Sequence, residues 1–260
     1  MQIPKHIYHY TTIESLACIL KFKTFKFSRL DCVNDPLEGL TELDKGARKF
    51  VYISSWTNNK EDHIPMWKMY AGDMSGVRIK MPSWLFSNSV ELVDMDVGYR
   101  KIEKISKILP LKTEYKIDGS TVTIERIYGP SDLLYLKDND AVLKRSSTKQ
   151  VTIKAGKILN FSLLGDAKLR HWQYEKEWRF RAYLTPHGIH IFGHDVNVMD
   201  TIFESEPPKS IGVPYNEKAL SEFEVMIGPK ASDGSLILLK AVLREYAPDA
   251  ILKRSGIEIT

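Results

Sequence analysis

Apolar and polar residues alternate in several short stretches of the chain, a pattern that predicts β-strands. The clearest stretch is residues 50–56, Phe-Val-Tyr-Ile-Ser-Ser-Trp, which is rich in aromatic and β-branched side chains. The Asp118-Gly119 pair lies between two β-rich arms and predicts a tight hairpin over residues 115–122. Further strands are expected at residues 6–11, 26–28, 76–81, 178–183, 224–229 and near 250–259.

Helical spacing of apolar residues appears directly after the first predicted strand. The apolar residues between Ile13 and Leu20 recur every three or four positions, and Thr11 with Glu14 has the spacing of a capping box. Other helices are expected at residues 37–48, 66–70 and 232–246, and in part of 141–166. The pattern predicts a mixed α+β fold around a split antiparallel β-sheet core, with short helices after the first and second strands. We expect one domain over residues 1–260, with residues 100–166 as an insertion or subdomain.

Composition narrows the class of protein. The chain has 260 residues, 43% of them hydrophobic, which is enough for a substantial core. It contains no apolar run near the roughly 20 residues of a membrane helix, and its first residues lack the features of a signal peptide. The two cysteines, Cys18 and Cys32, do not suggest a disulfide framework. We therefore expect a cytoplasmic protein without a membrane partner; the net charge of +4 permits a polyanionic partner but does not require one.

Two local patterns place polar groups at positions where chemistry can occur. His9 and Thr11 lie two residues apart in the first predicted strand and so share one face. Ser54 and Ser55 place two hydroxyls at the end of the clearest strand. Taken separately, a strand histidine is usually structural, and hydroxyl residues are common at strand ends.

A third pattern is Glu175-Lys176-Glu177, which would place both glutamates on one face of a strand. The simplest interpretation of this segment is a solvated strand face, on which Glu177, Arg179 and Arg181 form surface ion pairs. The alternative interpretation is a pair of carboxylates that takes part in catalysis.

Six short runs of residues, taken together and in order, resemble a known family. They are Tyr8-His9-Tyr10-Thr11, Asn34-Asp35-Pro36-Leu37-Glu38, Ser54-Ser55-Trp56, Met66-Trp67-Lys68-Met69-Tyr70 with Gly76, Trp172-Gln173-Tyr174-Glu175-Lys176-Glu177-Trp178-Arg179, and Ile227-Gly228-Pro229. The chain resembles, from residue 6 to near its C-terminus, the bacterial and phage proteins grouped as domain of unknown function 2971. The resemblance is weakest between residues 100 and 165, and it does not itself name a reaction.

The order of a strand histidine, strand-end hydroxyls and a Glu-x-Glu segment is also similar, more remotely, to ADP-ribosyltransferases, including the DarT-type enzymes that modify DNA. This resemblance implies an ADP-ribosyltransferase-like fold with NAD as the substrate. It implies that His9 and Thr11 bind the NAD ribose and that Ser54 and Ser55 line the nicotinamide pocket. By the same resemblance Glu177 is catalytic, and Glu175 orients an acceptor.

The implied chemistry is consistent with these residue types. Cleavage between ribose and nicotinamide builds positive charge on the sugar, which a fixed carboxylate stabilises. Glu177 should then stay ionised, favoured by Arg179 or Arg181, although the Arg179 guanidinium would equally suit the diphosphate. The expected function is ADP-ribosyl transfer to a nucleic acid or protein, or NAD cleavage, in a toxin or phage-defence setting. The oligomeric state stays open.

Other interpretations remain at this point. The same fold could serve as a non-catalytic module that binds a nucleotide or a partner. A metal-dependent nuclease could use His9, Asp35 and Glu38, and His190, His194 and Asp195 could bind a metal if their segment were a strand rather than a turn. We assign no metal. The simpler interpretations are that Asp35 caps a helix, that residues 66–70 belong to the core, and that the basic residues 144–149 form a solvated surface.

Overall fold

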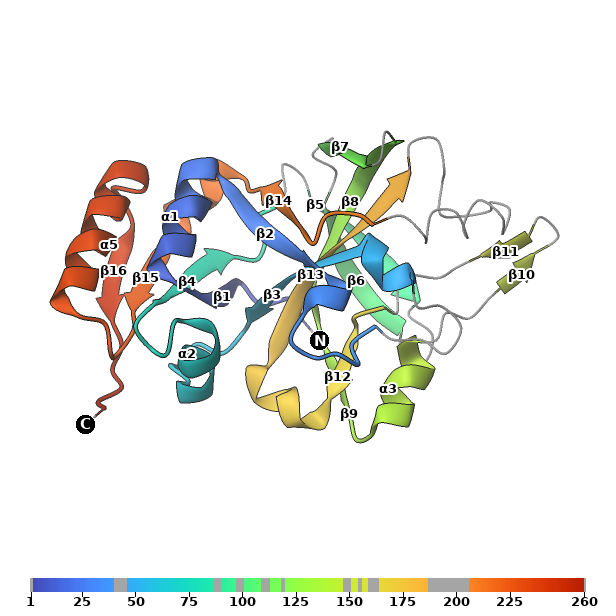
Figure 1. Cartoon of the computed structure of the whole chain (residues 1–260), viewed down its shortest axis with the longest axis horizontal. Coiled ribbons are helices and arrows are strands. Elements are labelled where there is room, and N and C mark those ends of the chain that lie inside the picture. Colours follow the sequence, from blue (N-terminus) through green and yellow to red (C-terminus); the bar gives the residue numbers. More distant parts are fainter. Residues whose placement is uncertain are drawn as a thin grey trace.

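The computed structural model describes residues 2–39, 46–86, 90–96, 101–108, 113–117, 120–146, 151–153, 156–158, 164–186 and 206–259. Within them the protein is a mixed α+β fold built on one large, mostly antiparallel sheet, as the sequence predicts (Figure 1). No helix in these ranges is long and apolar enough to cross a membrane.

The central strands and helices follow the sequence pattern closely. The first half of the chain contains β1 (His6–Thr11), α1 (Ile13–Phe22), β2 (Thr24–Arg29), η1 (Leu30–Cys32), η2 (Ala47–Phe50), β3 (Val51–Thr57), α2 (Ile64–Tyr70), β4 (Val77–Pro82), β5 (Val90–Asp96), β6 (Lys101–Ile108), β7 (Thr113–Ile117) and β8 (Ser120–Asp132). The second half contains β9 (Leu134–Leu136), α3 (Asn139–Ser146), β10 (Val151–Ile153), β11 (Gly156–Ile158), β12 (Ala167–Leu169), η4 (Arg170–Glu175), β13 (Glu177–Pro186), β14 (Ser210–Pro214), η5 (Glu217–Glu222), β15 (Glu224–Ile227), α5 (Asp233–Tyr246) and β16 (Ile251–Arg254).

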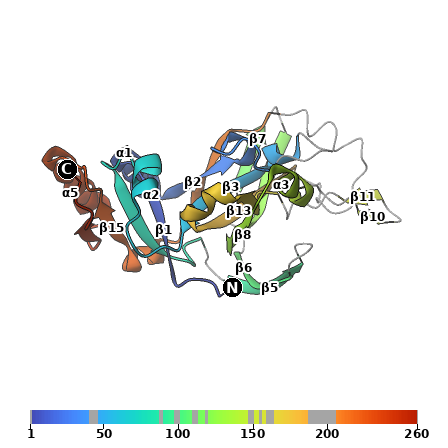
Figure 2. The ribbon, with the colours of Figure 1, turned by 90° about the horizontal axis from the view of Figure 1, so that it is seen from below.

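The main sheet has the strand order β16-β15-β4-β1-β3-β13-β8-β6-β5. Its pairs are antiparallel except for β15 with β16, and β2, β7 and β14 branch from this path. Helix α1 lies beside α5 at one end of the molecule, and the long β8 and β13 strands form its centre (Figure 1). In the view from below, the sheet bends along its length, with β5 and β6 curving away from the central strands (Figure 2).

The sheet is split along one edge of β3. The opposite edge of β3 pairs with β13 from Val51 to Thr57. On the split edge, β1 meets β3 only at Thr57, whereas β2 meets it only at Tyr52 and Ile53. Residues 54–56 therefore lie between the two partner strands, which diverge on either side of them. This gap is the feature of the fold that positions the candidate site.

Aromatic packing surrounds the split. Phe25 of β2 packs against Trp56 of β3 with a ring separation of 5.0 Å, and Phe86 packs against Phe180 at 4.7 Å. The same apolar cluster takes in the buried faces of α1 and α5. Large buried aromatic side chains contribute strongly to core stability, and here they fix the strands that diverge at the gap.

The other face of β1 packs against α2. Tyr10 meets Trp67 edge to face at 4.9 Å, and Met66 is buried in the same small cluster. This packing bears out the interpretation of this helix as part of the core for Met66 and Trp67, and Tyr70 packs partly against the same cluster, whereas Lys68 and Met69 are exposed.

Two predicted features differ from the structure, whereas a third, the hairpin, agrees with it. No α-helix occupies the described parts of residues 37–48: residues 37–39 form a turn, residues 47–50 form the short 3-10 helix η2, and residues 40–45 lie outside the described ranges. The N-cap of α1 is Thr12 rather than Thr11, and its hydroxyl accepts a hydrogen bond from the Ser15 amide. The predicted hairpin over 115–122 is present, since β7 pairs with β8 up to Ile117 and Ser120.

Candidate functional site

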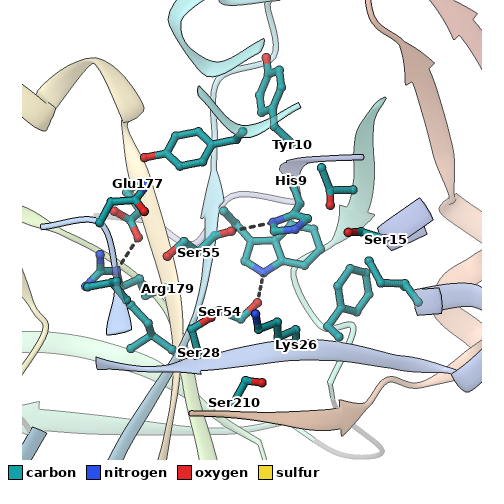
Figure 3. Close-up of a pocket in the computed structure, with 18 of the residues that line it drawn as sticks. His9, Tyr10, Ser15, Lys26, Ser28, Ser54, Ser55, Glu177, Arg179 and Ser210 are labelled. Atoms are coloured by element: carbon teal, nitrogen blue, oxygen red, sulfur yellow. Dashed lines mark hydrogen bonds and ion pairs between the residues drawn. The ribbon is translucent and has the colours of Figure 1, made fainter. Parts of the chain in front are cut away.

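A cavity of about 690 Å³ occupies the split in the sheet (Figure 3). Its walls come from β1, α1, β2, β3, β14 and the segment around η4 and β13. All seven residues predicted as site residues line it: His9, Thr11, Ser54, Ser55, Glu175, Glu177 and Arg179. The reason is topological, because β1, β3 and β13 are neighbours in the sheet.

His9 is held by its ring nitrogen Nδ1, which lies 2.9 Å from the backbone carbonyl oxygen of Ser55. A carbonyl can only accept, so Nδ1 carries the hydrogen. Burial lowers the pKa of His9, which favours the neutral imidazole at physiological pH. Nε2 is then an unprotonated acceptor. The ring also packs against Trp56 at 5.1 Å, which fixes its plane.

Ser54 and Ser55 differ in environment although they are adjacent. The buried Ser54 hydroxyl oxygen accepts a hydrogen bond of 3.0 Å from the indole Nε1 of Trp56. Because the indole is a donor only, the hydroxyl hydrogen of Ser54 stays available for another acceptor. The side chain of Ser55 is exposed on the opposite face of the strand from that of Ser54.

Glu175 and Glu177 meet at one ammonium group. The Nζ atom of Lys168 lies 2.8 Å from a carboxylate oxygen of each glutamate. Tyr70 donates its hydroxyl hydrogen to the other oxygen of Glu175. The backbone amide of Glu177 donates to the Tyr135 hydroxyl at 2.8 Å. These contacts come from α2, β9 and β12, three elements far apart in the sequence.

Arg179 connects this cluster to Glu38 in the loop over residues 34–38. Its Nε donates to Glu177, and its Nη1 donates both to Glu38 and to the carbonyl oxygen of Gly165, the last at 2.9 Å. Burial lowers the pKa of Arg179, but two carboxylates contact the guanidinium and hold it in the charged form. Arg179 lines the cavity while being bound to protein groups, which favours a role in holding Glu177 over direct contact with a diphosphate.

The protonation of Glu177 differs from the expectation of a permanently ionised carboxylate. Burial raises the pKa of Glu177 to about 7, an effect that Lys168 opposes and the neighbouring Glu175 reinforces. The carboxyl group is 3% exposed, so water does little to stabilise its charge. Glu177 therefore titrates in the physiological range.

The structure overturns the simplest interpretation of the glutamate segment. Glu177, Arg179 and Arg181 are buried at 3%, 1% and 1% exposure, so they do not form a solvated strand face. Glu175 is also not on the strand: it ends η4, and Lys176 turns the chain with a φ of 44° before β13 begins. The two carboxylates nevertheless meet, because this turn brings both to Lys168.

The loop over residues 34–38 is both structural and part of the cluster. The side chain of Asp35 accepts from the Leu37 amide at 3.0 Å, so it caps a turn rather than the predicted helix. Asn34 lines the cavity, and Glu38 contacts Arg179. Lys168 had no sequence signal, Tyr70 was assigned to the core, and Glu38 was considered only as a metal ligand. These three residues belong to the site because of contacts with segments far away in the sequence, which local patterns do not reveal.

A metal centre of His9, Asp35 and Glu38 is not formed. Among the described residues, no group of three or more His, Cys, Asp or Glu side chains is arranged to hold a metal ion. His9 contacts the Ser55 carbonyl, and Glu38 contacts Arg179. The histidines at 187–194 lie outside the described residues.

The fold and the site define a mixed α+β protein with a split antiparallel sheet, a cavity in the split and a buried cluster of carboxylates and cations at one end. Residues 66–180 match the model of a family described as a protein of unknown function (DUF2971). This match confirms the family predicted from the short motifs; the runs before residue 66 and after residue 180 lie outside the matched range. No curated protein and no solved structure matches the chain.

Proposed function

We propose that the cavity binds NAD and cleaves the bond between its ribose and nicotinamide, with transfer of ADP-ribose to a macromolecular acceptor or to water. The observation that supports this most is that His9, Ser54 and Glu177, from three neighbouring strands, line one cavity. The family match itself names no activity.

The hydrogen-bonding character of the walls suits a sugar with free hydroxyls. Nε2 of His9 offers an acceptor, and the Ser54 hydroxyl offers a donor. Both groups are fixed by partners on β3, so little conformational freedom is lost when a ligand binds. A volume of about 690 Å³ lies in the range of small-molecule sites.

In this proposal Glu177 acts in its ionised form. It accepts a hydrogen bond from the ribose and stabilises the positive charge that develops as the glycosidic bond breaks. The bonding electron pair leaves with the nicotinamide nitrogen, and an acceptor oxygen or nitrogen then bonds to the same sugar carbon and loses its proton. In this proposal Glu175, which shares the Lys168 ammonium with Glu177, orients that acceptor and receives the proton. Nucleic acid and protein are both acceptors to be tested, and a toxin or phage-defence role belongs to this same proposal.

A second candidate is a non-catalytic module that binds a nucleotide or a partner in the same cavity. It is favoured by the number of ion pairs that already hold Glu177, since a carboxylate bound to Lys168 and Arg179 is also a stabilising element of the fold. The two candidates differ in whether bound NAD is cleaved.

The test is nicotinamide release from NAD by the purified protein, with single-stranded DNA, RNA or cell proteins added in turn. We expect release by the wild type and loss of at least about 100-fold for Glu177→Gln, the scale of removing one strong electrostatic group from an active site. Glu217→Gln is the matched control, because Glu217 is largely exposed and does not line the cavity. NAD binding without release would favour the second candidate, and absence of both would refute the NAD assignment.

A further inference from the structure

Lys168 lines the cavity where Glu175 and Glu177 meet, and the proposed reaction does not use it in any step. Its side chain is 7% exposed, and its ammonium lies 2.8 Å from each of Glu175 and Glu177 and 4.0 Å from Glu38. The ammonium also lies 5.1 Å from the centre of the Trp172 ring. A buried lysine loses solvation, and here the contacts with the carboxylates compensate for that loss.

We propose that Lys168 is a positioning residue, whose ammonium holds the carboxylates of Glu175 and Glu177 together and favours the charged form of Glu177. Its catalytic consequence rests on the proposed function. Two carboxylates this close repel each other when both are ionised, and a shared cation opposes that repulsion. Without Lys168, the pair would separate or one member would take up a proton.

The groups around Glu177 determine whether the removal of Lys168 raises or lowers the pKa of Glu177. Arg179 on the same strand and Lys168 on β12 favour its charged form, whereas Glu175 at the end of η4 and burial itself disfavour it. The Ser55 hydroxyl on β3 hydrogen-bonds to the carboxylate and supports the charged form. Tyr135 on β9 binds only the backbone amide of Glu177, and Glu38 acts through Arg179.

Removal of the lysine charge should therefore raise the pH at which Glu177 ionises. Lys168→Arg keeps the charge and should keep that pH close to its wild-type value. Glu175→Gln removes the repelling neighbour and should lower it. Since Lys168 influences Glu177 more strongly than Glu175 does, the double variant Lys168→Met/Glu175→Gln should lie between the wild type and Lys168→Met.

The experiment is titration of the Glu177 carboxyl carbon by NMR, in protein labelled with ¹³C at the glutamate side-chain carboxyls. The signal is assigned by its loss in Glu177→Gln. We expect Lys168→Met to raise the titration midpoint by about one pH unit or more, a shift of the size that one close charge produces. If Lys168→Met does not fold, the double variant replaces it, because it removes one positive and one negative charge together; its midpoint should still lie above that of Glu175→Gln.

Lys176→Met is the matched control. Lys176 lies between the two glutamates in sequence, but its side chain is exposed and does not line the cavity. It should leave the midpoint unchanged. An unchanged midpoint in Lys168→Met, or equal midpoints for the double variant and Glu175→Gln, would overturn the proposal.

The same variants separate this proposal from the proposed function. If nicotinamide is released, Lys168→Met should move the rising limb of kcat against pH upward, and Lys168→Arg should restore it. Release with an unshifted pH profile would refute the role of Lys168 and leave NAD cleavage intact. A shifted NMR midpoint in a protein that neither binds nor cleaves NAD would support Lys168 and refute the NAD assignment.

Discussion

The Nδ1 atom of His9 donates a hydrogen bond to the backbone carbonyl oxygen of Ser55, across the gap where β1 and β3 diverge. At this point the side chain of His9, rather than the backbone of a neighbouring strand, bonds to β3. The bond occupies the Ser55 carbonyl and leaves Nε2 as the acceptor of a histidine that lines the cavity (Figure 3). One histidine thus closes the sheet and presents an acceptor to a ligand.

We predict that His9→Asn weakens NAD binding while keeping the fold. The asparagine amide can still donate to Ser55, but it does not supply the acceptor at the position of Nε2. Loss of one hydrogen bond of about 1–1.5 kcal/mol should raise KM for NAD roughly tenfold, with a smaller effect on kcat. His6→Asn is the control, since His6 contacts Glu222 and does not line the cavity. An unchanged KM in His9→Asn would contradict the assignment of ribose binding to Nε2.

Ser54→Ala should destabilise the protein more than Ser55→Ala does. In Ser54→Ala the indole Nε1 of Trp56 loses its acceptor while Trp56 remains 2% exposed. A buried donor without a partner costs about 1–3 kcal/mol in the free energy of unfolding. The side chain of Ser55 is exposed, so the loss of its hydrogen bond to Glu177 should cost about 1 kcal/mol or less. Urea denaturation of both variants measures the difference, and equal stabilities would show that the indole finds another acceptor.

The stability of the protein should depend on pH through Glu177. The pKa of Glu177 is about 7 in the folded state and near 4.5 when unfolded, so between these values the folded state binds more protons. The contribution of this group to stability is therefore present below about pH 4.5 and is lost as the pH rises toward 7.

Glu177→Gln removes this titration. From pH 5 to pH 7.5, the free energy of unfolding of the wild type should fall relative to that of Glu177→Gln by about 1 kcal/mol or more. Denaturation of the two proteins over this range gives the difference directly, and Glu217→Gln should follow the wild type throughout. Parallel curves for wild type and Glu177→Gln would mean that Glu177 ionises at its ordinary pKa.

Arg179→Met should be strongly destabilising, because it leaves the carboxylates of Glu38 and Glu177 buried without the cation between them. Breaking a buried ion pair on one side costs about 3–5 kcal/mol. Arg179→Met combined with Glu38→Gln should recover part of this loss, because one of the two stranded charges is gone. Lys253→Met removes a half-exposed lysine from Glu224 but leaves Lys80 3.6 Å from the same carboxylate, so it should cost at most about 1 kcal/mol. If the double variant were no more stable than Arg179→Met, direct pairing of Glu38 with Arg179 would not account for the loss.

Much of the fold follows from local sequence. The alternation around residues 50–56 predicts β3, and the apolar spacing after residue 12 predicts α1, because strand and helix periodicities depend only on neighbours along the chain. The prediction of one α-helix over residues 37–48 was wrong for the residues that the structure describes. Its charged residues have helical propensity, but Glu38 is buried against Arg179, a contact that local propensity does not contain.

The sequence by itself determined the residue types of the candidate site, His9, Ser54 and Glu177, and the strands that carry them. Only the tertiary structure decided that these strands are neighbours, that the sheet opens at residues 54–56, and that Lys168 lies between Glu175 and Glu177. The physical reason is the distance along the chain over which each effect acts. Strand periodicity acts over a few residues, whereas burial, repulsion between carboxylates and the pKa of Glu177 depend on groups that only folding brings together.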